Sequence, residues 1–77
     1  MNVLELKGKR VAKGYKQSQI ANILKMTDKT FCIYENSEIC KFSLNHVLTL
    51  TKLYDLTLSD VNYIFFDNSL PNGNNTA

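Results

Sequence analysis

The chain has 77 residues, of which 44% are hydrophobic and 21% are charged, and its formal net charge is +2. A chain of this length is expected to form a single domain, and this hydrophobic fraction is ordinary for a globular protein. The sequence contains no apolar run of about 18 residues and no signal-peptide pattern, so we expect neither a membrane partner nor secretion but a cytoplasmic protein.

The two cysteines and the single histidine do not form a metal-binding or disulfide pattern. Small secreted scaffolds usually use about four or more cysteines, and structural zinc sites use closely spaced Cys and His pairs. We therefore expect Cys32 and Cys40 to be reduced thiols, with no metal and no other cofactor. His46 has no cysteine or carboxylate at a spacing typical of catalysis, so nothing predicts an enzyme.

Charge is distributed unevenly along the chain. Residues 1–41 contain eight basic and four acidic residues, a net charge of +4, whereas residues 42–77 contain one basic and three acidic residues, a net charge of −2. A basic half beside an acidic half suits a domain that docks one face on phosphate groups. A mixed, solvated surface is the alternative interpretation.

The first half of the chain predicts three short helices. The first covers residues 3–13 and ends at Gly14, because glycine favours a helix C-terminus. The second covers residues 17–24, with Lys16 in the cap position where Ser, Thr, Asp or Asn is usual. The third covers residues 28–36, with Thr27 as its N-cap and Asp28 in its first turn.

The second half predicts two more helices and a tail. Ser43 caps a helix that extends to about residue 54. Its expected inner positions are Leu44, Val47, Leu48, Leu50, Thr51 and Tyr54. Thr57 caps the last helix, and Leu58 begins its inner row. A short edge strand over residues 63–66 is the less favoured alternative. Residues 67–77 are polar, so we expect a domain over residues 1–66 and a disordered polar tail over residues 67–77.

A group of residues in the second and third helices forms a recognisable pattern. Their spacing lets the two helices pack across each other around a tight connector. The group comprises Gln17, Ile20, Ala21, Leu24, Thr27, Thr30, Phe31, Tyr34 and Glu35. With the junction over residues 53–58, it resembles the lambda-repressor-like helix-turn-helix family, the Cro-type and phage-repressor-type regulators. The resemblance covers residues 3–62.

This resemblance implies an all-α fold, a compact five-helix lambda-repressor-like DNA-binding domain. Its helix-turn-helix would be formed by helices 2 and 3, with helix 3 in the major groove. Two positions depart from the family pattern. Lys25 stands where the turn usually has glycine, which costs roughly 1 kcal/mol in a left-handed conformation. Ser37 replaces the glycine that usually follows Asn36.

Several residues of the pattern have structural roles. Ala21 must be small because the third helix crosses over it, and Phe31 and Tyr34 fill the angle between the helices. The resemblance also implies an ion pair between Arg10 and Glu35, which would orient helix 3 more than it stabilises the fold. The alternative is two solvated side chains that never meet.

Contacts to the DNA backbone are expected from a helix N-terminus and from lysines. The second helix begins at Gln17, and free N–H groups at such an end bind phosphate. By resemblance this position touches the DNA backbone. These contacts position a protein without reading sequence, and for each lysine the alternative is ordinary surface solubility. The candidates are Lys9, Lys13, Lys16, Gln17, Asn36 and Lys41.

Base readout is expected from the outward face of helix 3. Lysine can donate to guanine, aspartate can accept from cytosine, and an isoleucine can meet a thymine methyl group. We therefore expect modest direct readout, helped by DNA shape. A passive small residue, rather than an oxidation sensor, is the favoured interpretation of the cysteine. The candidates are Asp28, Lys29, Thr30, Cys32 and Ile33.

The predicted partners are double-stranded DNA and a second copy of the chain, with no small-molecule ligand. Tyr63 and Phe66 fall outside the inner row of the last helix and predict a homodimer interface. The alternative is that both rings fold back under the tail. The favoured function is a phage or mobile-element repressor that binds a palindromic operator. The alternative is an antitoxin or another protein-interaction module of the same fold.

Overall fold

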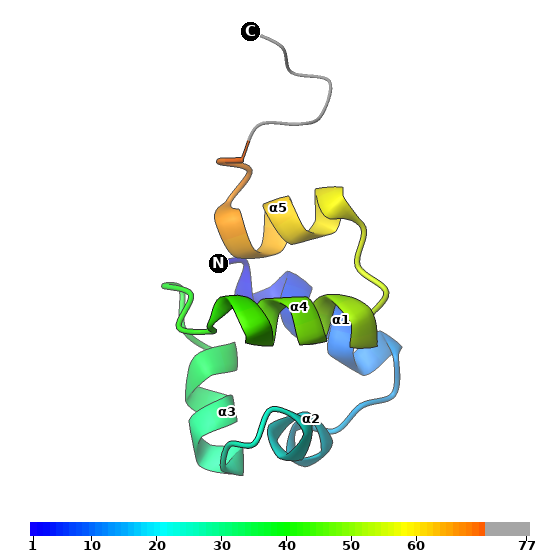
Figure 1. The fold of residues 1–77 in the computed structure, drawn as a ribbon, viewed down its shortest axis with the longest axis vertical. Coiled ribbons are helices and arrows are strands. Elements are labelled where there is room, and N and C mark those ends of the chain that lie inside the picture. Colours follow the sequence, from blue (N-terminus) through cyan, green and yellow to red (C-terminus); the bar gives the residue numbers. More distant parts are fainter. Residues whose placement is uncertain (71–77) are drawn as a thin grey trace, which may run out of the picture.

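The computed structural model describes residues 1–70, and all regular structure within them is helical (Figure 1). The all-α prediction is therefore confirmed, and residues 63–66 are helical rather than extended. The first four helices each end one residue earlier than expected. The helices are α1 (Val3–Ala12), α2 (Gln17–Ile23), α3 (Asp28–Glu35), α4 (Leu44–Leu53) and α5 (Leu58–Phe66).

Three of the helices begin at the predicted hydroxyl caps. The side chains of Thr27, Ser43 and Thr57 each accept a hydrogen bond from the backbone N–H three residues later, over 3.1, 3.2 and 3.1 Å. Such a cap contributes about 1 kcal/mol because it satisfies a helix N–H that has no partner within the helix. At α5 the Asp60 carboxylate in turn accepts a hydrogen bond from the Thr57 N–H, and at α4 the His46 Nδ1 accepts one from the Ser43 N–H.

Helix α5 is followed by two residues with positive φ, Asp67 and Asn68. Helices α1, α2 and α4 are each followed, two positions beyond their last residue, by one such residue. These residues are Gly14, Lys25 and Asp55, with φ of 78°, 59° and 52°. In each case the next residue's N–H bonds back across the last turn, as in the Lys25 turn where Met26 N–H donates to the Ala21 carbonyl over 2.9 Å. Glycine is favoured in this conformation, so Lys25 and Asp55 hold a strained turn.

The helices enclose one core, to which every helix contributes. Phe31 of α3 is fully buried in this core, and Phe42, from the segment between α3 and α4, packs beside it with ring centroids 6.0 Å apart. Figure 1 shows α2 and α3 at one end of the molecule, α4 in front of α1, and α5 beyond α4. The buried apolar residues are Met1, Leu6, Ile20, Ala21, Leu24, Phe31, Phe42, Val47, Leu50, Tyr54, Leu56, Ile64 and Phe65.

Three leucines that were expected to face inward lie on the surface. Leu44 and Leu48 are 70% and 51% exposed, and Leu58 is 74% exposed. In α4 the expected burial is confirmed for Val47, Leu50 and Tyr54 but wrong for Leu44 and Leu48, because the buried row is narrower than expected. Leu44 and Leu48 therefore lie on the flank of that row. Leu58 stands in the first turn of α5, ahead of its buried residues.

Residues 67–70, which the sequence placed in the tail, are joined to α5. The buried side-chain amide of Asn62 donates to the Leu70 carbonyl over 2.9 Å and accepts from the Leu70 N–H over 3.0 Å. These two bonds satisfy an amide that would otherwise be buried without partners. The rest of the expected tail, residues 71–77, lies outside the described residues.

Candidate nucleic-acid interface

A buried ion pair joins α1 to the last turn of α3. Arg10 Nε donates to Glu35 Oε2 over 2.8 Å, and Arg10 Nη2 donates to Glu35 Oε1 over 3.4 Å. The Glu35 side chain is fully buried, and Arg10 Nη1 is bonded to the Tyr15 carbonyl over 2.8 Å. A buried pair of this kind fixes geometry more than it adds stability, because both charges have lost their hydration. It therefore sets where α3 lies relative to α1.

The side chain of Gln17 belongs to this buried cluster. Its Nε2 donates to Glu35 Oε1 over 3.0 Å, so the amide points inward from the first turn of α2. Its own backbone N–H remains at the helix start. Lys16, in the cap position, is exposed, and its backbone N–H donates to the Gln19 side chain over 2.8 Å. Of the polar groups of Gln17, the backbone N–H rather than the side-chain amide is therefore the candidate for a phosphate contact.

The outer face of α3 is exposed and its inner face is buried. Asp28, Lys29, Cys32 and Ile33 are exposed, whereas Phe31 and Glu35 are fully buried. At 100° per residue the four exposed positions span a continuous arc of about 140°. Four of the five candidates for base readout therefore share one surface.

Two polar candidates near this face make local hydrogen bonds. The fifth base-readout candidate, Thr30, is half-buried, and its hydroxyl is bonded to that of Thr27 over 2.9 Å. Asn36 is exposed at the C-terminus of α3, where its Nδ2 donates to the Cys32 carbonyl over 2.7 Å. This bond caps the last turn of α3.

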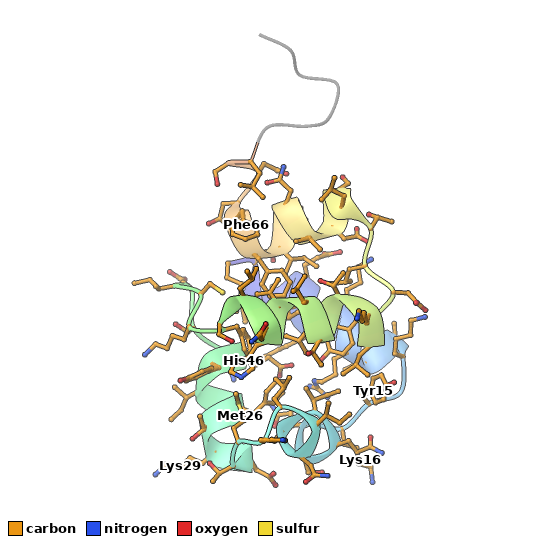
Figure 2. All side chains as sticks on the ribbon, viewed as in Figure 1. Tyr15, Lys16, Met26, Lys29, His46 and Phe66 are labelled. Carbon is orange, nitrogen blue, oxygen red and sulfur yellow. The ribbon has the colours of Figure 1, made fainter. Side chains whose placement is uncertain are left out.

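The candidate lysines fall into two groups. Lys13 Nζ lies 2.6 Å from Asp55 Oδ2, and Lys9 Nζ lies 3.8 Å from Asp60 Oδ1. These two cations are therefore turned toward the α4–α5 connection and the first turn of α5. Within residues 1–70 no carboxylate lies within 4.0 Å of the lysines at positions 16, 25, 29 and 41. Figure 2 shows Lys16 and Lys29 at the same end of the molecule, the end formed by α2 and α3.

The two aromatic candidates for a dimer interface differ in their environment. Tyr63 is 44% exposed, whereas Phe66 is half-buried and packs against the core. Figure 2 shows Phe66 at the C-terminal end of α5. Leu44 and Leu48, which the sequence placed inside, add exposed apolar surface on α4.

Sequence reasoning overlooked two tyrosines of the buried cluster. The Tyr15 carbonyl accepts from Arg10, and the Tyr54 ring lies 6.1 Å from that of Tyr15, between centroids. A backbone carbonyl leaves no signal in a sequence. The helical spacing had placed Tyr54 on the inner row of α4, but it could not indicate that its ring would lie beside that of Tyr15.

Asp60, in the first turn of α5, has a shifted pKa. Hydrogen bonds from the backbone N–H of Thr57 and, to a smaller extent, from its hydroxyl lower the pKa of Asp60, and the charge of Lys9 adds a smaller effect in the same direction.

Among residues 1–70 no three His, Cys, Asp or Glu side chains gather where they could hold a metal ion. No helix in that part of the chain is long and apolar enough to cross a membrane.

Comparisons of the chain with protein-family models, with curated proteins and with solved structures gave no match.

Proposed function

We propose that this chain is a lambda-repressor-like helix-turn-helix protein that binds specific DNA and regulates transcription. Helices α2 and α3 form the helix-turn-helix, and α3 enters the major groove. The observation that supports this most strongly is the two-sided character of α3. Its inner face is held by Glu35 and Phe31, while its outer face presents side chains that make no ion pair within residues 1–70.

The charges around α3 support the same proposal. Lys16 immediately precedes α2, Lys25 lies in the connector and Lys29 lies on α3, and all three are exposed. Phosphate contacts from such lysines supply most of the non-specific affinity of DNA-binding proteins. Together with the N-terminus of α2 at Gln17 and the exposed Lys41, these three lysines form the surface that contacts the DNA backbone. Lys9 and Lys13 contribute less, because each already faces a carboxylate.

The exposed side chains of α3 define a modest direct readout. Lys29 donates to guanine, Asp28 accepts from cytosine, and Ile33 contacts a thymine methyl group. None of them makes the two-bond contact that Arg, Asn or Gln makes with a single base. Specificity therefore depends partly on the shape and deformability of the DNA.

The protein binds a palindromic operator as a homodimer in this proposal. A two-fold dimer matches two half-sites one helical turn apart. Tyr63, with the exposed rim of Phe66, forms part of the dimer contact on α5.

One observation favours the second candidate, a protein-interaction module such as an antitoxin. Leu44 and Leu48 stand one turn apart on α4 and are both more than half exposed. Adjacent exposed leucines are typical of a protein contact rather than of a DNA contact. DNA binding with a steep salt dependence separates the regulator from this alternative.

The test uses DNA selected from a random-sequence library and DNA from upstream of the protein's own gene. Affinity should fall steeply between about 50 and 200 mM salt, as expected when phosphates are neutralised. Lys29→Ala should weaken binding by about 5- to 150-fold, equivalent to about 1–3 kcal/mol for a base contact. The matched control is Lys52→Ala, because Lys52 is exposed on α4 and carries the same charge. Equal effects of the two substitutions, or salt-independent binding, would contradict the proposal.

A further inference from the structure

A hollow in the surface lies where three segments of the chain meet. These segments are the start of α1, the connection between α3 and α4, and the residue that follows α5, and the hollow has a volume of about 620 Å³. It is lined by residues 1–4, Glu38, Ile39 and Asp67. Ligand pockets in proteins commonly have volumes of about 300–1,000 Å³. The hollow is therefore large enough to hold a few side chains of a partner.

Hydrogen bonds hold the three segments against one another. The Asn2 N–H donates to the Ile64 carbonyl over 2.7 Å, which fixes the start of α1 against α5. The Met1 ammonium donates to the Glu38 carbonyl and lies 3.3 Å from Asp67 Oδ2. The Met1 side chain is fully buried. The walls of the hollow are thus tied to the folded core, as in the largely preformed sites of ligand-binding proteins.

Two aliphatic side chains of the lining are strongly exposed. Leu4 is 80% exposed and Ile39 is 78% exposed, the two highest values among the large hydrophobic residues within residues 1–70. They belong to segments that are distant in the sequence, yet both line the same hollow. Single exposed apolar residues are common, whereas exposed apolar residues that gather at one place are typical of a protein contact. The apolar part of the hollow therefore suits an aliphatic side chain of a partner.

The charged side chains that line the hollow are both acidic. Glu38 is exposed and makes no ion pair within residues 1–70. The Asp67 side chain is 72% exposed, although it faces the Met1 ammonium. No lysine or arginine is among the described residues of the lining. Beside the apolar contact offered by Leu4 and Ile39, the hollow thus offers an anionic one, and the matching group is a cation.

We propose that this hollow is a docking site for a partner protein, and that it holds an exposed segment of that partner in which a lysine or arginine adjoins an aliphatic residue. The aliphatic side chain packs against Leu4 and Ile39, which removes apolar surface of both proteins from water. The cation lies beside Glu38 and Asp67 and determines which segments fit, because complementary charge contributes more to specificity than to affinity. The contact is small, so binding is weak and reversible.

The docking site lies apart from the surface that the proposed function assigns to DNA. Figure 1 shows the N-terminus beside the C-terminal end of α5, whereas α2 lies at the other end of the molecule. Lys16 and Lys29, which Figure 2 shows at the end formed by α2 and α3, are not part of the lining. The inference therefore does not depend on the proposed function, and it is tested without DNA.

Short random-sequence peptides, displayed on phage and selected on the immobilised protein, test the chemistry of the occupant. The selected peptides should share a lysine or arginine next to a leucine, isoleucine or valine. A synthetic copy of the most enriched peptide, added to the isotope-labelled protein, should shift the NMR signals of residues 1–4, 38–39 and 67. Enriched peptides that lack a cation, or shifts concentrated elsewhere on the protein, would overturn the inference.

Substitutions in the lining test the two contacts separately. Leu4→Gln should weaken binding of the synthetic peptide by about tenfold, the effect of losing a leucine contact. The matched control is Leu58→Gln, because Leu58 is 74% exposed in the first turn of α5 and does not line the hollow. Glu38→Gln should weaken binding by about two- to fivefold in dilute salt, and by less at about 1 M salt, where charges are screened.

Both glutamine variants replace exposed leucines, so both should keep the Tm of the unmodified protein. Equal losses of peptide binding for Leu4→Gln and Leu58→Gln would refute the docking site. A loss caused by Leu44→Gln instead would place the peptide on α4. If no peptide is enriched and Leu4→Gln abolishes self-association, the occupant is a second copy of the chain and the inference is wrong.

Discussion

Arg10 Nε lies 2.8 Å from Glu35 Oε2, and the Glu35 side chain is completely buried. The two residues are 25 positions apart, so their contact ties the first helix to the end of the third. Gln17 adds a third member from the second helix. The orientation of α3, and with it the surface that the proposed function assigns to DNA, depends on these three side chains.

Removing one member of the ion pair should destabilise the protein strongly. Arg10→Met leaves the Glu35 carboxylate buried with the Gln17 amide as its main partner. The free energy of unfolding should fall by about 3–5 kcal/mol, measured by urea denaturation. The double variant Arg10→Met/Glu35→Leu should recover most of the loss, because no buried charge remains. A loss below about 1 kcal/mol for Arg10→Met alone would mean that the pair is open to water in solution.

Lys9 and Lys13 should contribute less to DNA affinity than the lysines beside α3. Lys13 is held 2.6 Å from Asp55, so a phosphate must compete with that carboxylate, whereas Lys16 has no carboxylate within 4.0 Å among residues 1–70. Lys16→Ala should reduce the slope of log affinity against log salt by about 1, the loss of one phosphate contact. Lys13→Ala should reduce it by less. The reverse order would place the DNA on the α1 side of the molecule.

Alkylation of Cys32 should block DNA binding. The thiol is exposed on the outer face of α3, and a maleimide adduct there would fill the space between α3 and the groove. The measurement uses a Cys40→Ala variant, which retains Cys32, treated with N-ethylmaleimide before a DNA titration. Bound DNA should also slow the modification. The matched control is Cys32→Ser, which retains only the half-buried Cys40 and should bind DNA equally well with or without the reagent.

The turn between α2 and α3 should be improved by glycine. Lys25 has φ of 59°, a left-handed conformation that costs a residue with a side chain roughly 1 kcal/mol. Lys25→Gly should therefore raise the free energy of unfolding by up to about 1 kcal/mol, less the entropy that glycine adds to the unfolded chain. Lys52→Gly, inside α4, should instead lower it by about 1 kcal/mol. A destabilised Lys25→Gly protein would show that the lysine side chain makes a contact that outweighs the strain.

The helix boundaries could be predicted from the sequence because they depend on local chemistry. Thr27, Ser43 and Thr57 each cap a helix through their own hydroxyl and a backbone N–H three residues away. Gly14 ends α1 in the conformation for which glycine is suited. The nearest residues along the chain determine these features, and no tertiary contact is needed to foresee them.

Other features depend on residues that are distant in the sequence. Lys13 was expected to face DNA, but its partner Asp55 lies 42 positions away. The side chain of Gln17 turns inward because Glu35 is buried beside it. The periodicity of α4 placed Leu44 on an inner face, although a neighbouring row is the one that packs on the core. Local patterns cannot reveal which of two adjacent rows a partner helix will cover.

The central claim is that α3 presents its outer face to DNA. Its most direct test is an NMR titration of the labelled protein with DNA selected from a random-sequence library, following every backbone amide. We expect the largest shifts in residues 28–36 and at the start of α2, near Lys16 and Gln17, with little change at the α4–α5 junction around Asp55. Shifts concentrated on α4, around Leu44 and Leu48, or no shifts on adding DNA, would contradict the claim.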